Sequence, residues 1–295
     1  GSSQSLGRGS IVNNTSLVLN QTSAGTLVGA ISGAGTLTKS GTGAVTLSGV
    51  NSFTGGTTIS SGSLIGGSRS FGTGAIVNNA SLVLDQATDA SFGSLISGTG
   101  SLTKTGAGAV TLAGVNSLTG GTTISQGTLV GNTQSFGTGD IVNNASLVID
   151  QTTDANFGLV ISGTGSLTKT GAGTLTLTGA STYTGNTSIS ANSPASPAVS
   201  SVILGVDNAL PIGTGLIVGT KTGLGVPVLD LNGKNQQLAY IADGANVTAA
   251  KYLKVVNNHA SSPSVLTLGG SVSPGKAFSG YISDGAGTIA LVKTG

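Results

Sequence analysis

The chain has 295 residues, 51 of them Gly, with only 7% charged residues and a formal net charge of +2. It has no Cys, which excludes disulfides, thiol catalysis and Cys-ligated metals. The small net charge, without a basic cluster interleaved with aromatic residues, excludes a nucleic-acid partner. No apolar run approaches the ~18 residues that cross a bilayer, so we expect no direct membrane insertion. Scarce helix formers beside abundant Val, Ile and Thr predict an all-β fold.

Internal repeats organise the first part of the chain. "GSIVNNTSLVLNQ", "GAIVNNASLVLDQ" and "GDIVNNASLVIDQ" begin at Gly9, Gly74 and Gly139, which gives a constant 65-residue period. A second, longer pattern keeps the same period from Gly33, Gly98 and Gly163. The residues in register include Lys39, Lys104 and Lys169, and also Phe53, Leu118 and Tyr183. Three tandem copies therefore fill residues 1–190.

Each copy contains several short strand candidates separated by Gly-rich turns. In the first copy we expect strands at Ser16–Asn20, Gly25–Ile31, Thr36–Lys39, Ala44–Ser48, Thr57–Ser60 and Ser63–Ile65. Within "AVTLSG", Val45 and Leu47 share one face of the strand, and Thr46 takes the other.

Two architectures suit short repeated strands, a propeller and a solenoid. A 65-residue unit with almost no aromatic residues fits a propeller blade poorly. We therefore predict a right-handed parallel β-helix (β-solenoid) of roughly 12–14 rungs, at about 20 residues a rung. Each copy would form about three rungs, although two large ones are also compatible with its length.

The remaining part, residues 191–295, reads as a degenerate continuation of the β-helix. A Pro/Ser-rich loop is expected at 191–200, within "ANSPASPAVSS". The last residues, "DGAGTIALVKTG", are similar to the start of another copy. We therefore expect that the sequence is truncated inside a further repeat and belongs to a longer protein.

The stretch "SGTGSLTKTGAGTLTLTGASTYTGNTSIS" (Ser162–Ser190) closely resembles the autotransporter-associated β-strand repeat, also called the passenger-associated transport repeat. The other two copies resemble it nearly as well. "DNALPIGTGLIV" and "LDLNGKNQQLAYI" are similar to the segments that follow such repeats.

This resemblance implies a passenger domain of Gram-negative type V secretion, exported across the outer membrane to the cell surface. It also implies a C-terminal β-barrel of the same precursor as a partner. Adhesins, autoaggregation proteins, toxins and passengers with enzyme domains all occur in such a family. The implied external partners are other cell surfaces, a host receptor or matrix, or further copies of the same protein.

Few residues suggest catalysis. The only His, His259, lies in a turn-like stretch, and the nearby Ser262 and Ser264 form no nucleophile elbow. Asp85 and Asp150 occupy equivalent positions, as do Asp89 and Asp154, which favours solvated turn residues over one active site. The two arginines, Arg8 and Arg69, stand near no Asp cluster in sequence, and the Ca²⁺-binding nonapeptide is missing.

We therefore expect no catalytic, cofactor-binding or metal-binding residue. The Gly-x-Gly motifs, such as Gly33-Ala34-Gly35, precede no helix pattern and are expected to be turns. The lysines in register are expected at rung corners, solubilising the surface. If each copy forms three rungs, they would stand ~14 Å apart in a row that could meet an anionic polymer. The paired asparagines, such as Asn13-Asn14, are expected in turns that use left-handed backbone.

Three functions remain open. The leading hypothesis is a non-catalytic extracellular stalk that supports secretion and folding, and surface adhesion or autoaggregation. The second is the scaffold of a passenger enzyme, for example one acting on polysaccharide, whose site lies in 191–280 or elsewhere in the protein. The third is ice binding through Thr-x-Thr runs such as Thr174, Thr176 and Thr178. It is disfavoured because the position of Thr174 holds Ala44 and Ala109 in the other copies.

Overall fold

The computed structural model describes residues 2–190, 199–219, 226–244, 254–270 and 277–294, which form strands, turns and irregular backbone without any helix. The all-β parallel β-solenoid predicted from the sequence is confirmed. Most of the loop expected at 191–200 lies outside the described residues. The chain forms two compact units, Gly1–Val142 and Asn143–Gly295, which are described separately. The division at residue 190 suggested by the repeats remains a prediction.

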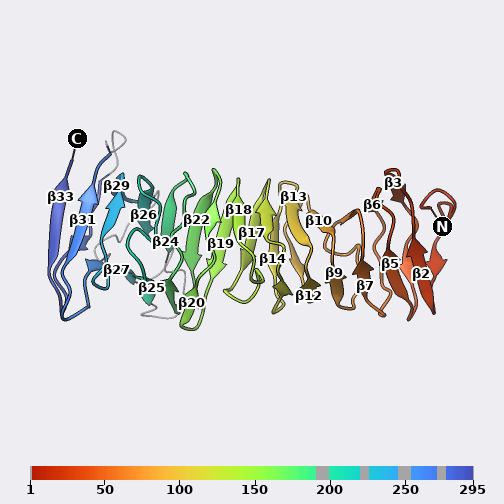
Figure 1. The fold of residues 1–295 in the computed structure, drawn as a ribbon, viewed down its shortest axis with the longest axis horizontal. Coiled ribbons are helices and arrows are strands. Elements are labelled where there is room, and N and C mark those ends of the chain that lie inside the picture. The colour runs from red at the N-terminus through yellow and green to blue at the C-terminus, as the bar shows by residue number, and fades with distance from the viewer. Residues whose placement is uncertain (1, 191–198, 220–225, 245–253, 271–276, 295) are drawn as a thin grey trace. The chain divides into compact units, whose positions relative to one another are not determined.

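Unit 1 is built from three parallel sheets and one short strand pair, and Figure 1 shows its strands as successive turns. Side 1 comprises β2 (Ser16–Leu19), β5 (Thr36–Lys39), β7 (Thr57–Ile59), β9 (Ile76–Asn78), β12 (Ile96–Gly98) and β15 (Ser117–Leu118). Side 2 comprises β3 (Gly25–Leu27), β6 (Ala44–Leu47), β8 (Ser63–Gly66), β10 (Ser81–Asp85), β13 (Ser101–Thr105) and β16 (Thr122–Ile124). Side 3 comprises β11 (Ala90–Phe92), β14 (Ala109–Leu112) and β17 (Thr128–Gly131). The separate pair is β1 (Ile11–Val12) with β4 (Ile31–Ser32).

The turn length follows from the strand register. Leu17 pairs with Leu37, twenty residues later, and Leu37 pairs with Thr57, again twenty residues later. Thr57 pairs with Ile76, nineteen residues later. The rung length predicted from the sequence is therefore confirmed, and the six strands of side 1 represent six successive turns of unit 1.

One copy of the repeat does not close a whole number of turns. Three turns carry the chain from Leu17 through Leu37 and Thr57 to Ile76. The remaining six residues of the 65-residue period reach Leu82, the equivalent of Leu17, on side 2. A copy thus spans three and one-third turns, so equivalent strands of the first two copies, such as β2 and β10, lie on different sides. The expectation of about three rungs per copy is therefore confirmed, and the additional third of a turn rotates each copy relative to the one before it.

The core of unit 1 consists of stacked inward columns. Val45, Leu64, Leu82 and Leu102 are consecutive register partners on side 2, and all are fully buried. Burial of each such side chain contributes about 1.5–3 kcal/mol. Corners separate the strands, and the single strand expected over Gly25–Ile31 is divided into β3 and β4 by a corner at residues 28–30.

Unit 2 continues the same architecture with longer turns. Leu147 pairs with Leu167, twenty residues later, whereas the turn from Leu175 to its partner Val202 is seven residues longer. One sheet of unit 2 contains β19 (Ser146–Asp150), β22 (Ser166–Thr170), β24 (Thr187–Ser190), β26 (Gly215–Gly219) and β29 (Tyr240–Asp243). A second sheet contains β20 (Ala155–Phe157), β23 (Thr174–Leu177), β25 (Val199–Leu204), β27 (Val226–Asp230), β30 (Lys254–Val256) and β32 (Tyr281–Ile282). A third sheet holds β28 (Gln236–Leu238), β31 (Ser264–Leu268) and β33 (Ile289–Lys293), and β21 is Ile161–Ser162. Strand β18 (Ile141–Asn143) spans the boundary between the units.

Candidate functional site

The three lysines in register are core residues. Lys39 and Lys104 are fully buried, and Lys169 is 1% exposed. Lys104 occupies an inward column between its register partners Leu84 and Ile124. The prediction that these lysines lie at rung corners and solubilise the surface is therefore wrong. The signal was present in the alternation, since Lys39 is two residues from the inward Leu37 and shares its face.

Each buried ammonium group reaches backbone carbonyl oxygens at a corner of the β-helix. Lys104 Nζ donates to the carbonyl oxygens of Thr105 at 2.6 Å, Gly106 at 2.7 Å and Gln126 at 3.3 Å. Lys39 Nζ donates in the same way to the carbonyls of Gly41 and Ser61. The lysine thus ties its own corner to the corner of the next turn.

Lys169 repeats this arrangement in unit 2. Its Nζ donates to the carbonyl oxygens of Thr170 at 2.6 Å and Gly171 at 2.9 Å. Burial lowers the pKa of Lys169 to about 8, while the carboxylates of Asp150 and Asp154 act in the opposite direction. Burial also lowers the pKa of Lys39 and of Lys104, and the charge of Asp85 opposes this shift at Lys104.

These lysines do not form a row along one face. Lys39 belongs to β5 on side 1, whereas Lys104 belongs to β13 on side 2. The third of a turn that each copy adds separates them around the helix axis, and their burial removes them from any external partner. The prediction of a lysine row that could bind an anionic polymer is therefore also wrong.

The paired asparagines have a structural role that differs from the expected one. Asn78 is fully buried, and its Nδ2 donates to the carbonyl oxygen of Ser101 at 2.8 Å in the next turn. Asn13 and Asn143 make the same bond to Thr36 and Ser166. Among the described non-Gly residues, positive φ angles occur at Asn208 and Asn232, so the repeated pairs do not use left-handed backbone.

The repeated Asp residues connect consecutive turns at exposed corners. Asp89 Oδ1 accepts a hydrogen bond from the Ala109 backbone N–H at 2.8 Å, and Asp85 Oδ1 accepts one from Thr105 Oγ1 at 3.1 Å. Asp154 accepts the equivalent bond from the Thr174 N–H, which lowers the pKa of Asp154. These contacts agree with the interpretation of the acids as turn residues.

The polar residues singled out in unit 2 form no catalytic triad within the described chain. His259 is exposed after β30, and its backbone N–H donates to Asn257. Asp230, 6% exposed, accepts hydrogen bonds from the backbone N–H of Asn258 at 3.0 Å and from Asn258 Nδ2 at 2.9 Å. Asp230 thereby fixes the loop that carries His259, which is a structural use of Asp230.

Ice binding requires a regular array of Thr side chains, and no such array forms around Thr174, Thr176 and Thr178. Thr176 has Asn156 and Ile203 as its register partners, so the column mixes an amide, a hydroxyl and an aliphatic side chain.

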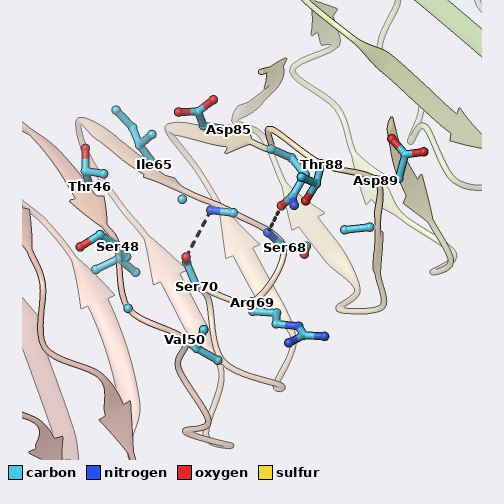
Figure 2. A pocket seen from close by; sticks show the side chains of 16 residues that line it. Thr46, Ser48, Val50, Ile65, Ser68, Arg69, Ser70, Asp85, Thr88 and Asp89 are labelled. Carbon is cyan, nitrogen blue, oxygen red and sulfur yellow. Dashed lines mark hydrogen bonds between the residues drawn. The ribbon is translucent and has the colours of Figure 1, made fainter. Parts of the chain in front are cut away.

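An open groove of about 590 Å³ lies on unit 1, where β6, β8 and the turn before β11 meet. Figure 2 shows Arg69 and Val50 on one side of this groove and Asp85 on the other. Gln86 Oε1 accepts a hydrogen bond from the Ser68 N–H at 2.8 Å and thereby joins two lining segments (Figure 2). The sequence did not reveal this grouping, because Arg69 and Asp85 are sixteen residues apart. The short turn is the cause, since Leu64 pairs with Leu82, only eighteen residues later.

The described part of the chain lacks the residue groupings of two further kinds of site. No group of three or more His, Cys, Asp or Glu residues is arranged to hold a metal ion there. The same residues include no helix with the length and apolar character needed to span a bilayer.

Stacked parallel turns, corners tied by buried lysines and a 65-residue period define a β-solenoid of tandem repeats. Residues 37–65, 102–130 and 167–191 match the passenger-associated-transport-repeat, and each matched range contains one of the buried lysines. The chain therefore carries three copies of a repeat that is characteristic of autotransporter passenger domains. No curated protein and no solved structure matches the chain significantly.

Proposed function

We propose that this β-helix is an autotransporter passenger exported to the cell surface, and that it is a non-catalytic scaffold whose outer faces mediate adhesion or self-association. The observation that carries the proposal is a pair of uncharged columns on the outer face of side 2 in unit 1. One column of consecutive register partners consists of Thr26, Thr46, Ile65, Val83, Thr103 and Thr123. The column beside it consists of Ala44, Ser63, Ser81 and Ser101.

These columns favour contact with another extended surface. Every member of the first column is β-branched, which restricts the side-chain rotamers and limits the entropy lost on contact. Neither column carries a charge that would repel a second face. Side 1 is similar, with Val18 and Val77 exposed by 42% and 40% on its outer face. Individually weak contacts along such faces sum when two extended molecules align.

The partners we propose are other cell surfaces, a host receptor or matrix, or a second copy of the chain. Self-association is the simplest to test, because a flat uncharged face is complementary to itself. The experiment displays the passenger on a non-clumping bacterium and measures cell sedimentation together with attachment to coated surfaces.

Charge placement provides matched variants for this experiment. The pair Thr103→Lys and Thr123→Lys puts two charges on the outer column of side 2. The pair Thr54→Lys and Thr119→Lys adds the same charge at exposed positions outside the strands. We expect the first pair to abolish clumping and the second to retain it. If wild-type display changes neither clumping nor attachment, the adhesive function is refuted.

The absence of catalysis is also part of the proposal. It is supported by the structural uses of Asp230 and of the repeated Asp residues, described above. The alternative, an enzyme scaffold, predicts that Asp230→Asn or His259→Ala abolishes a hydrolytic or eliminative activity on polysaccharide. We expect no turnover of polysaccharide by the wild-type chain, and turnover that either substitution abolishes would refute the proposal.

A further inference from the structure

The groove of unit 1 differs from the rest of its surface in concentrating charged side chains. Its volume of about 590 Å³ lies within the range of small-ligand sites. Its lining includes Arg69, Asp85 and Asp89, together with hydroxyl and amide side chains such as Ser48 and Gln86. Two members of the uncharged side 2 column, Thr46 and Ile65, also line the groove, and the charged side chains lie beside them.

The charges of the groove are not equally available to a ligand. Asp85 Oδ1 already accepts a hydrogen bond from Thr105 Oγ1. Asp89 already accepts the hydrogen bond from the Ala109 N–H. The Arg69 guanidinium makes no hydrogen bond or ion pair with any described residue, and it faces the groove (Figure 2). The groove therefore holds one guanidinium without a partner among the described residues, beside two carboxylates that keep their negative charge.

The hydrogen-bonding capacity of the groove indicates the rest of the ligand. Each Asp carboxylate has a second oxygen that can accept bonds from hydroxyl groups. A guanidinium presents a planar fork that matches a carboxylate. Val50, 64% exposed, offers a small apolar contact at the rim. A molecule with several hydroxyls, one carboxylate and some C–H surface is complementary to the Asp carboxylates, the guanidinium and the apolar rim of the groove.

We propose that this groove binds an acidic saccharide of the uronic-acid type. Arg69 pairs with the sugar carboxylate, while Asp85 and Asp89 accept bonds from hydroxyl groups. The proposal deepens the adhesive function by naming a ligand class, and in that respect it rests on it.

The repeats supply variants that the fold already accommodates. The residues equivalent to Arg69, Asp85 and Asp89 in a neighbouring copy are Gln134, Asn20 and Ala24. Arg69→Gln, Asp85→Asn and Asp89→Ala therefore place in the groove residues that a neighbouring copy carries naturally. Arg8→Gln removes the other arginine, an exposed one, and serves as the control.

The test is calorimetric titration of the full chain with oligogalacturonate and, separately, with a glucuronate-containing hyaluronan oligosaccharide. Methyl-esterified oligogalacturonate is the matched ligand, since it keeps the sugar and removes the charge. We expect binding of at least one acidic probe that weakens with added salt. We expect Arg69→Gln and the methyl ester each to reduce the affinity at least about tenfold, and Arg8→Gln to leave it unchanged.

The outcomes separate this proposal from the general function. If neither acidic probe binds, or if Arg69→Gln or the methyl ester binds as well as the original, the groove assignment is overturned. Cell clumping that persists in Arg69→Gln while saccharide binding is lost leaves self-association supported and confines the groove to ligand recognition. If the variant with Thr103→Lys and Thr123→Lys loses clumping but still binds the saccharide, side 2 mediates self-association and the groove acts independently of it.

Discussion

Replacing Lys104 by Met tests whether the buried lysines hold the corners together. Met preserves most of the stem that packs between Leu84 and Ile124 but removes the donor. Two short hydrogen bonds, to Thr105 at 2.6 Å and Gly106 at 2.7 Å, are then lost. Each buried carbonyl left without a donor costs about 1–3 kcal/mol. Relief of ammonium desolvation offsets part of this sum, so we expect a net loss of about 2–3 kcal/mol.

The assay is urea-induced unfolding followed by circular dichroism, with Lys254→Met as the control. Lys254 is exposed, so its replacement should change the free energy of unfolding by no more than about 0.5 kcal/mol. If the Lys104→Met variant is as stable as the wild type or more stable, desolvation outweighs the carbonyl contacts. The proposed role of the lysines would then be refuted.

Three further predictions concern stability. The pKa of Lys169 is lowered from 10.5 to about 8, so the unfolded chain binds this proton more tightly. Lys169 should therefore raise the stability between pH 8 and 10.5 by up to about 3 kcal/mol, so the rise in urea titrations should be larger for the wild type than for Lys169→Met, which keeps Lys39 and Lys104. Asn78→Ala removes the bond to Ser101 and should lower the free energy of unfolding by about 1–3 kcal/mol in the same assay. Gly98 has φ +106°, and a Cβ there would lie 2.2 Å from the Asn78 carbonyl oxygen. Gly98→Ala should therefore lower the thermal midpoint strongly, whereas Gly93→Ala, with open space around its Cβ, should not.

The fold could be predicted because its causes are local and repeated. Alternation in "AVTLSG" places Val45 and Leu47 inward, as observed. The Gly-rich corners recur often enough to fix the approximate length of a rung. The rotation between copies could not be predicted, because turns of eighteen, nineteen and twenty residues alternate, as at Leu64–Leu82 and Thr57–Ile76. Loop residues of similar composition form all of these corners.

The site features were harder to predict, for two physical reasons. A lysine is normally exposed, and only the corner carbonyls, which the sequence does not show, make the burial of Lys39 and Lys104 favourable. The groove depends on residues brought together by a single short turn, and Arg69 has no acidic neighbour in sequence. The repeated Asp residues were easier to interpret, because Asp85 and Asp150, like Asp89 and Asp154, occupy equivalent positions and make equivalent contacts across turns.

Cysteine cross-linking tests the central claim, a repeat of three and one-third turns, most directly. The chain has no native Cys, so each introduced pair is unambiguous. Ile65 and Val83 are register partners with outward side chains. An even division of the repeat period into three turns would instead align Ile65 with Ala87. We predict that Ile65→Cys with Val83→Cys forms a disulfide on mild oxidation and that Ile65→Cys with Ala87→Cys does not. Efficient cross-linking of the second pair instead of the first would contradict the account.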